Sequence, residues 1–280
     1  MTPLLEKIIL ETIQISLLVG VMMIVVDILN VVTRRKLEQF FKNAGRFRQY
    51  IIASLIGTTP GCIGGFTNVS LYIHGMISFG ALAGSMIAVS GDEAFVMLAM
   101  FPKQAILLFG ILFLIGIAGG WLIDLAVQRF KIRVCENCKE MVVHADERNF
   151  RHYFKEHVYE HIIKRHLWKT ALWTFGALLL VESGLAYLHL EEFTSQYKIL
   201  FLFFGALVGL IPESGPHLIF VTLFAQGLIP FSVLLTSSIV QDGHGMLPML
   251  SYSLKDSVIV KGFNFVIGLL IGLIVFLLGY

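Results

Sequence analysis

Long apolar stretches separated by short polar connections dominate the chain. Runs of about 20 or more mainly apolar residues, long enough to cross a bilayer, lie at 8–32, 51–73, 76–101, 104–127, 167–190, 199–224, 227–250 and 257–279. The first run contains Glu11 and Asp27 and lacks a small-residue cleavage site, so we interpret it as a retained helix and not as a signal peptide. The pattern predicts an all-α polytopic membrane protein.

Composition supports the same class. Of the 280 residues, 56% are apolar and only 14% are charged, whereas a soluble domain carries about 25% charged residues. Three cysteines, two of them spaced Cys135-x-x-Cys138, are typical neither of an extracellular disulfide framework nor of a secreted domain. The expected surroundings are therefore a lipid bilayer, and a homo-oligomer is compatible with the pattern.

Two basic segments fix the expected topology. Residues 33–49 carry six Lys and Arg against one acid, and residues 128–166 carry nine Lys and Arg, six acids and five of the nine histidines. The positive-inside rule places both segments in the cytoplasm. Three parts follow: a first membrane repeat at 1–127, a cytoplasmic Cys/His-rich loop and helix at 128–166, and a second membrane repeat at 167–280. Because these basic residues flank membrane segments, they give no support to nucleic-acid binding.

The two membrane parts are repeats of each other. With an offset of 152 and no gap, residues 55–120 match residues 207–272 at 20 of 66 positions. Apolar composition alone would produce some identities, but not shared Gly and Pro at one fixed offset. Fixed-period self-similarity of this kind indicates a duplicated structural unit.

The repeats are expected to be inverted. Between two cytoplasmic segments the chain must cross an even number of times, yet 50–127 shows three apolar stretches, so one must be re-entrant or broken. The expected breaks are at Gly57, Pro60 and Gly91, and at their equivalents Gly209, Pro212 and Gly243. Each repeat would consist of one full helix and an even number of further crossings, so it crosses the membrane an odd number of times. The second repeat would therefore insert with the opposite orientation. Interrupted segments would then meet near the bilayer midplane, as in secondary transporters.

Acids and histidines gather at these breaks. Ser90-Gly91-Asp92-Glu93 places two carboxylates in an otherwise uncharged run, and each such group costs about 2.5–3.5 kcal/mol on insertion scales, which usually marks a functional site. The predicted intramembrane set is Asp92, Glu93, Glu213, His217, Asp242 and His244, with Asp27 and Glu182 on flanking helices as coupling residues. Carboxylate and imidazole ligands suit Mn, Fe, Co or Zn. The alternative is a buried proton or ion-pair network without a metal.

Three further features bear on the choice of ligands and cofactors. Cys62 lies in the Gly-rich break and could be a soft ligand, but a single buried cysteine usually only packs. Ligand-type residues also occur in the cytoplasmic segment, either as a metal-sensing loop or as a solvated charged helix: Cys135, Cys138, His144, His152, His157, Glu160 and His161. No G-x-x-x-x-G-K-[ST] motif is present, so we expect no nucleotide cofactor and no nucleotide-driven transport.

Several of these motifs together resemble a known bacterial family. They are Gly57-Thr58-Thr59-Pro60-Gly61-Cys62, Ser90-Gly91-Asp92-Glu93, Pro212-Glu213-Ser214-Gly215-Pro216-His217, Gln241-Asp242-Gly243-His244-Gly245, and the His-rich stretch ending at His166. The family is that of ten-helix heavy-metal exporters, described as arsenic-efflux-like permeases or manganese transporters. The resemblance covers nearly the whole chain and implies ten helices in the bacterial inner membrane.

The residues and the resemblance together predict a non-enzymatic transporter of divalent metal ions, Mn-like and acting in efflux. The ion would bind between the broken helices of the two repeats, as substrate or ligand. One alternative is a permease for an oxyanion or a small organic anion such as an arsenical, with half-helix N-termini binding the negative charge. A third, less favoured interpretation is a membrane metallo-hydrolase that uses the same acids and histidines.

Overall fold

The computed structural model describes residues 4–17, 21, 45–73, 75–134, 168–187 and 196–280. All regular structure in these ranges is helical, which confirms the expected all-α class. Residues 4–17 are helical, and the first half contains α2 (Arg46–Gly57), α3 (Ile63–Ile73), α4 (Phe79–Ala88), α5 (Glu93–Met100) and α6 (Pro102–Arg129). The second half contains α8 (Trp168–Tyr187), α10 (Lys198–Gly209), η2 (Gly215–His217), α11 (Leu218–Ala225), α12 (Phe231–Val240), η3 (Gly243–Met246), α13 (Leu247–Tyr252) and α14 (Leu254–Leu277).

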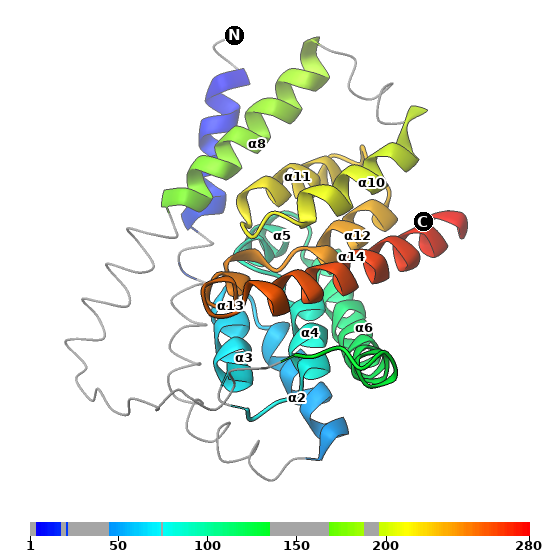
Figure 1. Cartoon of the computed structure of the whole chain (residues 1–280). Coiled ribbons are helices and arrows are strands. Elements are labelled where there is room, and N and C mark those ends of the chain that lie inside the picture. The colour runs from blue at the N-terminus through cyan, green and yellow to red at the C-terminus, as the bar shows by residue number, and fades with distance from the viewer. Residues whose placement is uncertain (1–3, 18–20, 22–44, 74, 135–167, 188–195) are drawn as a thin grey trace, which may run out of the picture.

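The order of elements repeats at the offset found in the sequence. Helices α2 and α10 begin and end 152 residues apart, and so do α4 and α12. Neighbour relations repeat as well, because α4 packs between α2 and α6 while α12 packs between α10 and α14. In Figure 1 helices α2, α3, α4 and α6 fill the lower part of the view and helices α10, α11, α12 and α14 lie above them, while the blue N-terminal helix stands beside α8 at the upper left.

Three helical stretches are long and apolar enough to cross a membrane, judged by length and composition among the described residues. They are Phe79–Met100, Pro102–Arg129 and Leu254–Leu277, and two shorter apolar helices are Lys198–Gly209 and Gly215–Ala225. The most apolar window of Phe79–Met100 is 94% buried, against 33% and 22% for the other two. The stretch α4–α5 is therefore central, whereas α6 and α14 each present an apolar outer face to the bilayer.

Small residues and one carboxylate hold the first half together. A Cβ added to Gly84 of α4 would collide with the backbone carbonyl of Gly116 in α6, so these helices approach closely, as membrane helices do at small residues. Near the end of α6, buried Asp124 accepts hydrogen bonds from the Gly80 amide (2.7 Å) and the Tyr50 hydroxyl (2.8 Å). This carboxylate links α2, α4 and α6, and so fixes the helices that carry the breaks.

Candidate metal-binding site

The first break follows α2. The hydroxyls of Thr58 and Thr59 donate back to the carbonyls of Leu55 (2.8 Å) and Ile56 (2.6 Å), which satisfies acceptors that the helix end would leave open. The amide of Gly61 then donates to the Gly91 carbonyl at 2.9 Å. The first and second breaks are therefore joined by a backbone hydrogen bond.

The second break and its equivalent in the other half both depend on glycine. Gly91, between α4 and α5, has φ +56°, and Gly243, the first residue of η3, has φ +52°. Side chains rarely adopt this left-handed conformation. A Cβ on Gly91 would also collide with a carboxylate oxygen of Glu93 and lie 2.7 Å from Ser214 Oγ. Both glycines are thus required by conformation, and Gly91 also by the close approach of polar side chains.

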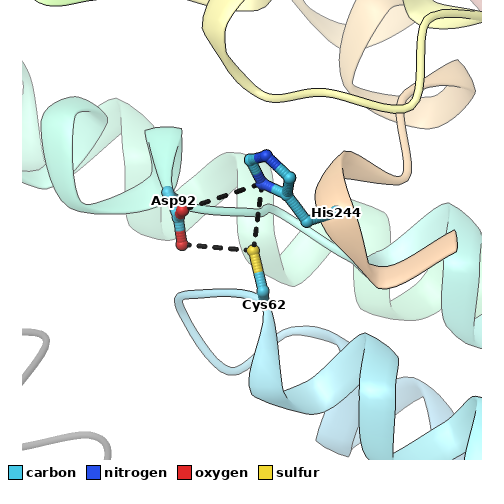
Figure 2. A group of neighbouring side chains, drawn as sticks. All are labelled: Cys62, Asp92 and His244. Carbon is cyan, nitrogen blue, oxygen red and sulfur yellow. Dashed lines mark hydrogen bonds and ion pairs between the residues drawn. The ribbon is translucent and has the colours of Figure 1, made fainter. Parts of the chain in front are cut away.

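Three side chains from different breaks converge in the described structure: Cys62, Asp92 and His244 (Figure 2). The Cys62 thiol donates to Asp92 Oδ1 at 3.3 Å, and its Sγ lies 3.6 Å from His244 Nδ1. His244 Nδ1 lies 3.9 Å from Asp92 Oδ2. The first and second breaks supply the thiol and the carboxylate, and the imidazole comes from the second half of the chain.

The spacing of these atoms suits one tetrahedral metal ion. Bonds of about 2.3 Å to sulfur and about 2.0–2.2 Å to nitrogen or oxygen give ligand-to-ligand separations of roughly 3.3–3.6 Å. The observed separations of 3.3, 3.6 and 3.9 Å require only small side-chain adjustments. Three protein ligands leave a fourth position open, which is typical of sites that exchange what they bind.

Glu213 lies on the opposite edge of the His244 ring. Its Oε1 is 3.9 Å from His244 Nε2, whereas the Nδ1 edge faces Cys62 and Asp92. Side-chain exposure falls from 35% at Glu213 to 15% at His244 and 8% at Asp92. Exposure therefore increases toward Glu213, whose carboxylate faces the ring edge opposite the other two ligands; a carboxylate in this position can orient a metal-binding histidine once it moves into hydrogen-bond distance.

Two side chains of the cluster lie at the N-termini of short helices. Cys62 directly precedes α3, and Asp92 is the residue that caps the start of α5. The partial positive charge of a helix N-terminus favours negative charge close to it. Both helix starts thus lie next to side chains of the cluster.

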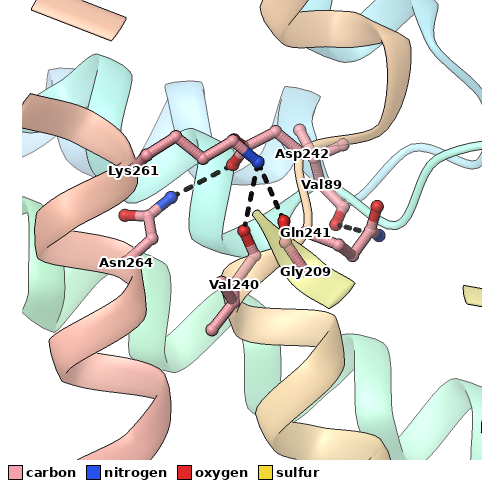
Figure 3. A network of polar contacts seen from close by, with 7 residues as sticks. All are labelled: Val89, Gly209, Val240, Gln241, Asp242, Lys261 and Asn264. Atoms are coloured by element: carbon pink, nitrogen blue, oxygen red, sulfur yellow. Dashed lines mark hydrogen bonds and ion pairs between the residues drawn. The ribbon is translucent and has the colours of Figure 1, made fainter. Parts of the chain in front are cut away.

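The structure places Asp242 away from this cluster. Its Oδ2 lies 2.6 Å from Lys261 Nζ, and its Oδ1 accepts a hydrogen bond from Asn264 at 3.1 Å (Figure 3). Lys261 also donates to the carbonyls of Gly209 (2.9 Å) and Val240 (3.5 Å). One ammonium group therefore neutralises Asp242 and satisfies the ends of α10 and α12.

The other predicted residues have separate locations. Glu93 and His217 are 1% and 2% exposed, and within the described ranges neither carboxylate oxygen nor either ring nitrogen has a hydrogen-bond partner. Glu182 belongs to α8, but its side chain is not among those described. Outside the described residues lie Asp27, Cys135, Cys138, His144, His152, His157, Glu160 and His161.

Two residues of the site were not among the predicted intramembrane set. The sequence offers Cys62 as a possible soft ligand but favours a packing role, although its position two residues after Pro60 in a break was the available signal. Lys261 is an isolated charge in the apolar run 257–279, and an intramembrane lysine is itself a functional signal. Its partner, Asp242, is separated from it by a helix break.

The fold and the site define a polytopic α-helical membrane protein with a metal-type ligand cluster where its broken helices meet. The chain belongs to the family described as "Putative, 10TM heavy-metal exporter", whose model matches residues 5–181 and 170–279. Membership confirms the family that the sequence predicts. It also confirms the class of the protein, a multi-pass transporter of heavy metals. Neither the curated proteins nor the solved structures contain a match to the chain.

Proposed function

We propose that the protein exports a divalent heavy-metal ion, which binds through Cys62, Asp92 and His244 between two inverted repeats. The observation that carries the proposal is the convergence of a thiol, a carboxylate and an imidazole from three helix breaks in both halves of the chain. Intramembrane groups of this kind are expensive to bury and mark ion pathways. Irregular backbone at this depth is tolerated where it lines such a pathway.

The ligand set narrows the class of metal. Carboxylates and histidines suit Mn, Fe, Co or Zn, and the family resemblance made the expected ion Mn-like, but Cys62 adds a soft ligand. Thiolate and imidazole together favour Zn²⁺ and similar borderline-to-soft ions over Mn²⁺, which prefers oxygen. We therefore propose a Zn²⁺- or Cd²⁺-like cargo, with Mn²⁺ as the comparison ion.

Binding and release follow from the contacts of the cluster. The thiol proton that Cys62 donates to Asp92 must leave when a metal binds the thiolate. Glu213 keeps Nδ1 of His244 turned toward the other two ligands. The ion would enter past Glu213, and rocking of one repeat against the other would open the cluster to the opposite side of the membrane.

Inversion of the repeats is supported by contacts between equivalent residues. Gln241 Nε2 donates to the carbonyl of Val89 at 3.2 Å, and these two positions are 152 residues apart. A Cβ on Gly243 would lie 3.5 Å from the Cα of Gly91, its own equivalent. A residue can contact its equivalent in the other repeat only when both lie near the axis that relates the two repeats. With both basic segments cytoplasmic, that axis would lie in the membrane plane.

Transport by purified protein in proteoliposomes tests this function. We expect uptake of Zn²⁺ and Cd²⁺ into vesicles by the wild type, weaker transport of Mn²⁺, and loss of transport in Asp92→Asn. Asp256→Asn is the matched control, since it also neutralises a buried aspartate but lies in the first turn of α14, outside the cluster. Unchanged flux in Asp92→Asn contradicts the proposal. Transport of arsenite with no divalent-ion flux would instead support the anion permease.

A further inference from the structure

A second group of buried polar atoms lies beside the metal-type cluster and is not used by it. The carboxylate of Glu93, the hydroxyl of Ser214 and the side-chain amide of Gln241 are 1%, 4% and 0% exposed. Across the described part of the chain, no hydrogen bond of good geometry satisfies either Glu93 carboxylate oxygen, Ser214 Oγ or Gln241 Oε1, although the Ser214 and Gln241 side chains lie close enough to Glu93 to interact with it. Buried polar groups are almost always satisfied, so four such oxygens in one place require an explanation.

These oxygens surround the two left-handed glycines. A Cβ on Gly91 would meet both a Glu93 carboxylate oxygen and Ser214 Oγ, the latter at 2.7 Å. A Cβ on Gly243 would lie 2.8 Å from the same Ser214 Oγ and 3.6 Å from Gln241 Oε1. The three side chains therefore approach a common region between the halves, which only residues without a Cβ leave open.

The orientation of the Gln241 side-chain amide is fixed by the hydrogen bond of its nitrogen. Its Nε2 donates to the Val89 carbonyl at 3.2 Å, which directs Oε1 away from that bond as a free acceptor (Figure 3). An amide held in this way offers its oxygen as a ligand, while the second hydrogen of Nε2 is not used in the bond to Val89. The donors in the group, the Ser214 hydroxyl and the second hydrogen of Gln241 Nε2, are fewer than its acceptor positions, and the three side chains include no positive charge.

We propose that Glu93, Ser214 and Gln241 form an all-oxygen site for one monovalent hard cation of the Na⁺ type. Carboxylate, hydroxyl and amide oxygens are the ligands of hard cations, and with neither nitrogen nor sulfur the set does not suit a heavy metal. One carboxylate balances one positive charge, whereas a divalent ion would leave a net charge buried. Backbone carbonyls of the breaks are available as additional ligands, as in transporters that bind Na⁺ at unwound helices.

The two sites share one helix break. Asp92 faces Cys62 and His244, while the next residue, Glu93, faces Ser214 across Gly91. Movement of this break on binding at one site must alter the other, so the monovalent cation is the coupling ion of transport. Binding of Na⁺ does not depend on the proposed function, but its coupling role rests on heavy-metal transport by the adjacent cluster.

Thermal unfolding of the full chain in detergent, without heavy metal, tests the binding step. We expect the unfolding temperature to rise with NaCl relative to KCl and choline chloride at equal ionic strength and constant pH. Glu93→Gln should remove this Na⁺ dependence, and Ser214→Ala should weaken apparent Na⁺ affinity at least tenfold. The matched control is Ser232→Ala, which removes another buried hydroxyl without a hydrogen-bond partner in the described structure but lies in the first turn of α12.

The wild-type titration is decisive even if a variant fails to fold. Equal unfolding temperatures in Na⁺, K⁺ and choline would overturn the site. So would a Na⁺ effect that persists in Glu93→Gln, or an unfolding temperature that changes with pH but not with Na⁺. Cys62→Ser separates the two proposals, because it should lose Cd²⁺ affinity and keep the Na⁺ effect. In proteoliposomes, a Na⁺ gradient should change Cd²⁺ flux in the wild type but not in Ser214→Ala. A wild-type Cd²⁺ flux that does not depend on Na⁺ would refute the coupling role but not the binding of Na⁺.

Discussion

Lys261 Nζ lies 2.6 Å from Asp242 Oδ2, inside the membrane region and 12% and 0% exposed respectively at their side chains. The pair places one positive and one negative charge where neither is solvated. Because the same ammonium group also reaches the carbonyls of Gly209 and Val240, it closes the ends of two helices. Asp242 therefore has a partner of its own and is not needed as a metal ligand.

This pair gives a stability prediction. Asp242→Asn or Lys261→Met alone should lower the free energy of unfolding by about 3–5 kcal/mol, because each leaves a buried charge without its partner. The double variant should lose clearly less than the sum of the two. Thermal unfolding in detergent measures this difference, and isothermal titration should show near-normal Cd²⁺ affinity for the double variant. Loss of Cd²⁺ binding in a well-folded double variant would restore Asp242 as a ligand.

Cys62 should decide metal preference. Cys62→Ser should weaken Cd²⁺ and Zn²⁺ binding at least about tenfold and Mn²⁺ binding much less, because manganese prefers oxygen ligands. Calorimetric titration of the purified protein measures both. The comparison is made in a background with Cys135→Ser and Cys138→Ser, in which Cys62 is the one remaining cysteine. Equal losses for Cd²⁺ and Mn²⁺ in Cys62→Ser would show that the thiol only packs.

His244 and Glu213 should differ in effect. His244→Ala removes a ligand and is expected to abolish measurable Zn²⁺ binding, whereas Glu213→Gln should weaken it about 10–100-fold, as loss of an orienting carboxylate does. Competition with a fluorescent zinc indicator covers this range of affinity. If both variants abolish binding to the same extent, Glu213 is itself a ligand and the assignment of roles is wrong.

Gly91 should not tolerate a side chain. Gly91→Ala adopts the left-handed conformation at a cost of about 1–2 kcal/mol, and its Cβ collides with Glu93. We expect reduced unfolding temperature and loss of transport. Gly110→Ala is the matched control, because a Cβ there meets nothing within 4 Å and alanine favours a helix by up to about 1 kcal/mol. A stable, active Gly91→Ala would contradict the described geometry of the break.

Inversion can be tested with two equivalent surface positions. Lys103 and Lys255 are 152 residues apart, in the first turns of α6 and α14. In a cysteine-free background, Lys103→Cys and Lys255→Cys should react with a membrane-impermeant thiol reagent from opposite sides of the membrane. Labelling of both from the same side would show parallel repeats.

The sequence alone determined the class, the repeat and the regions of broken helix. Apolar run lengths are set by bilayer thickness, and Gly and Pro at a fixed offset restrict the backbone locally, so both are visible without contacts. The helix ends at Gly57 and Gly209 coincide with positions selected in this way. Asp92 and His244 were also identifiable, because charge in an apolar run is costly wherever it lies.

Only the tertiary structure decided which of these groups meet. Asp242 and His244 are two residues apart, yet one faces Lys261 and the other faces Cys62 and Asp92. Turns at the breaks direct neighbouring side chains to opposite sides, and periodicity cannot predict this because no regular helix continues there. Cys62 became a candidate ligand for the same reason: its partners lie 30 and 182 residues away, and packing of the two halves alone brings them together.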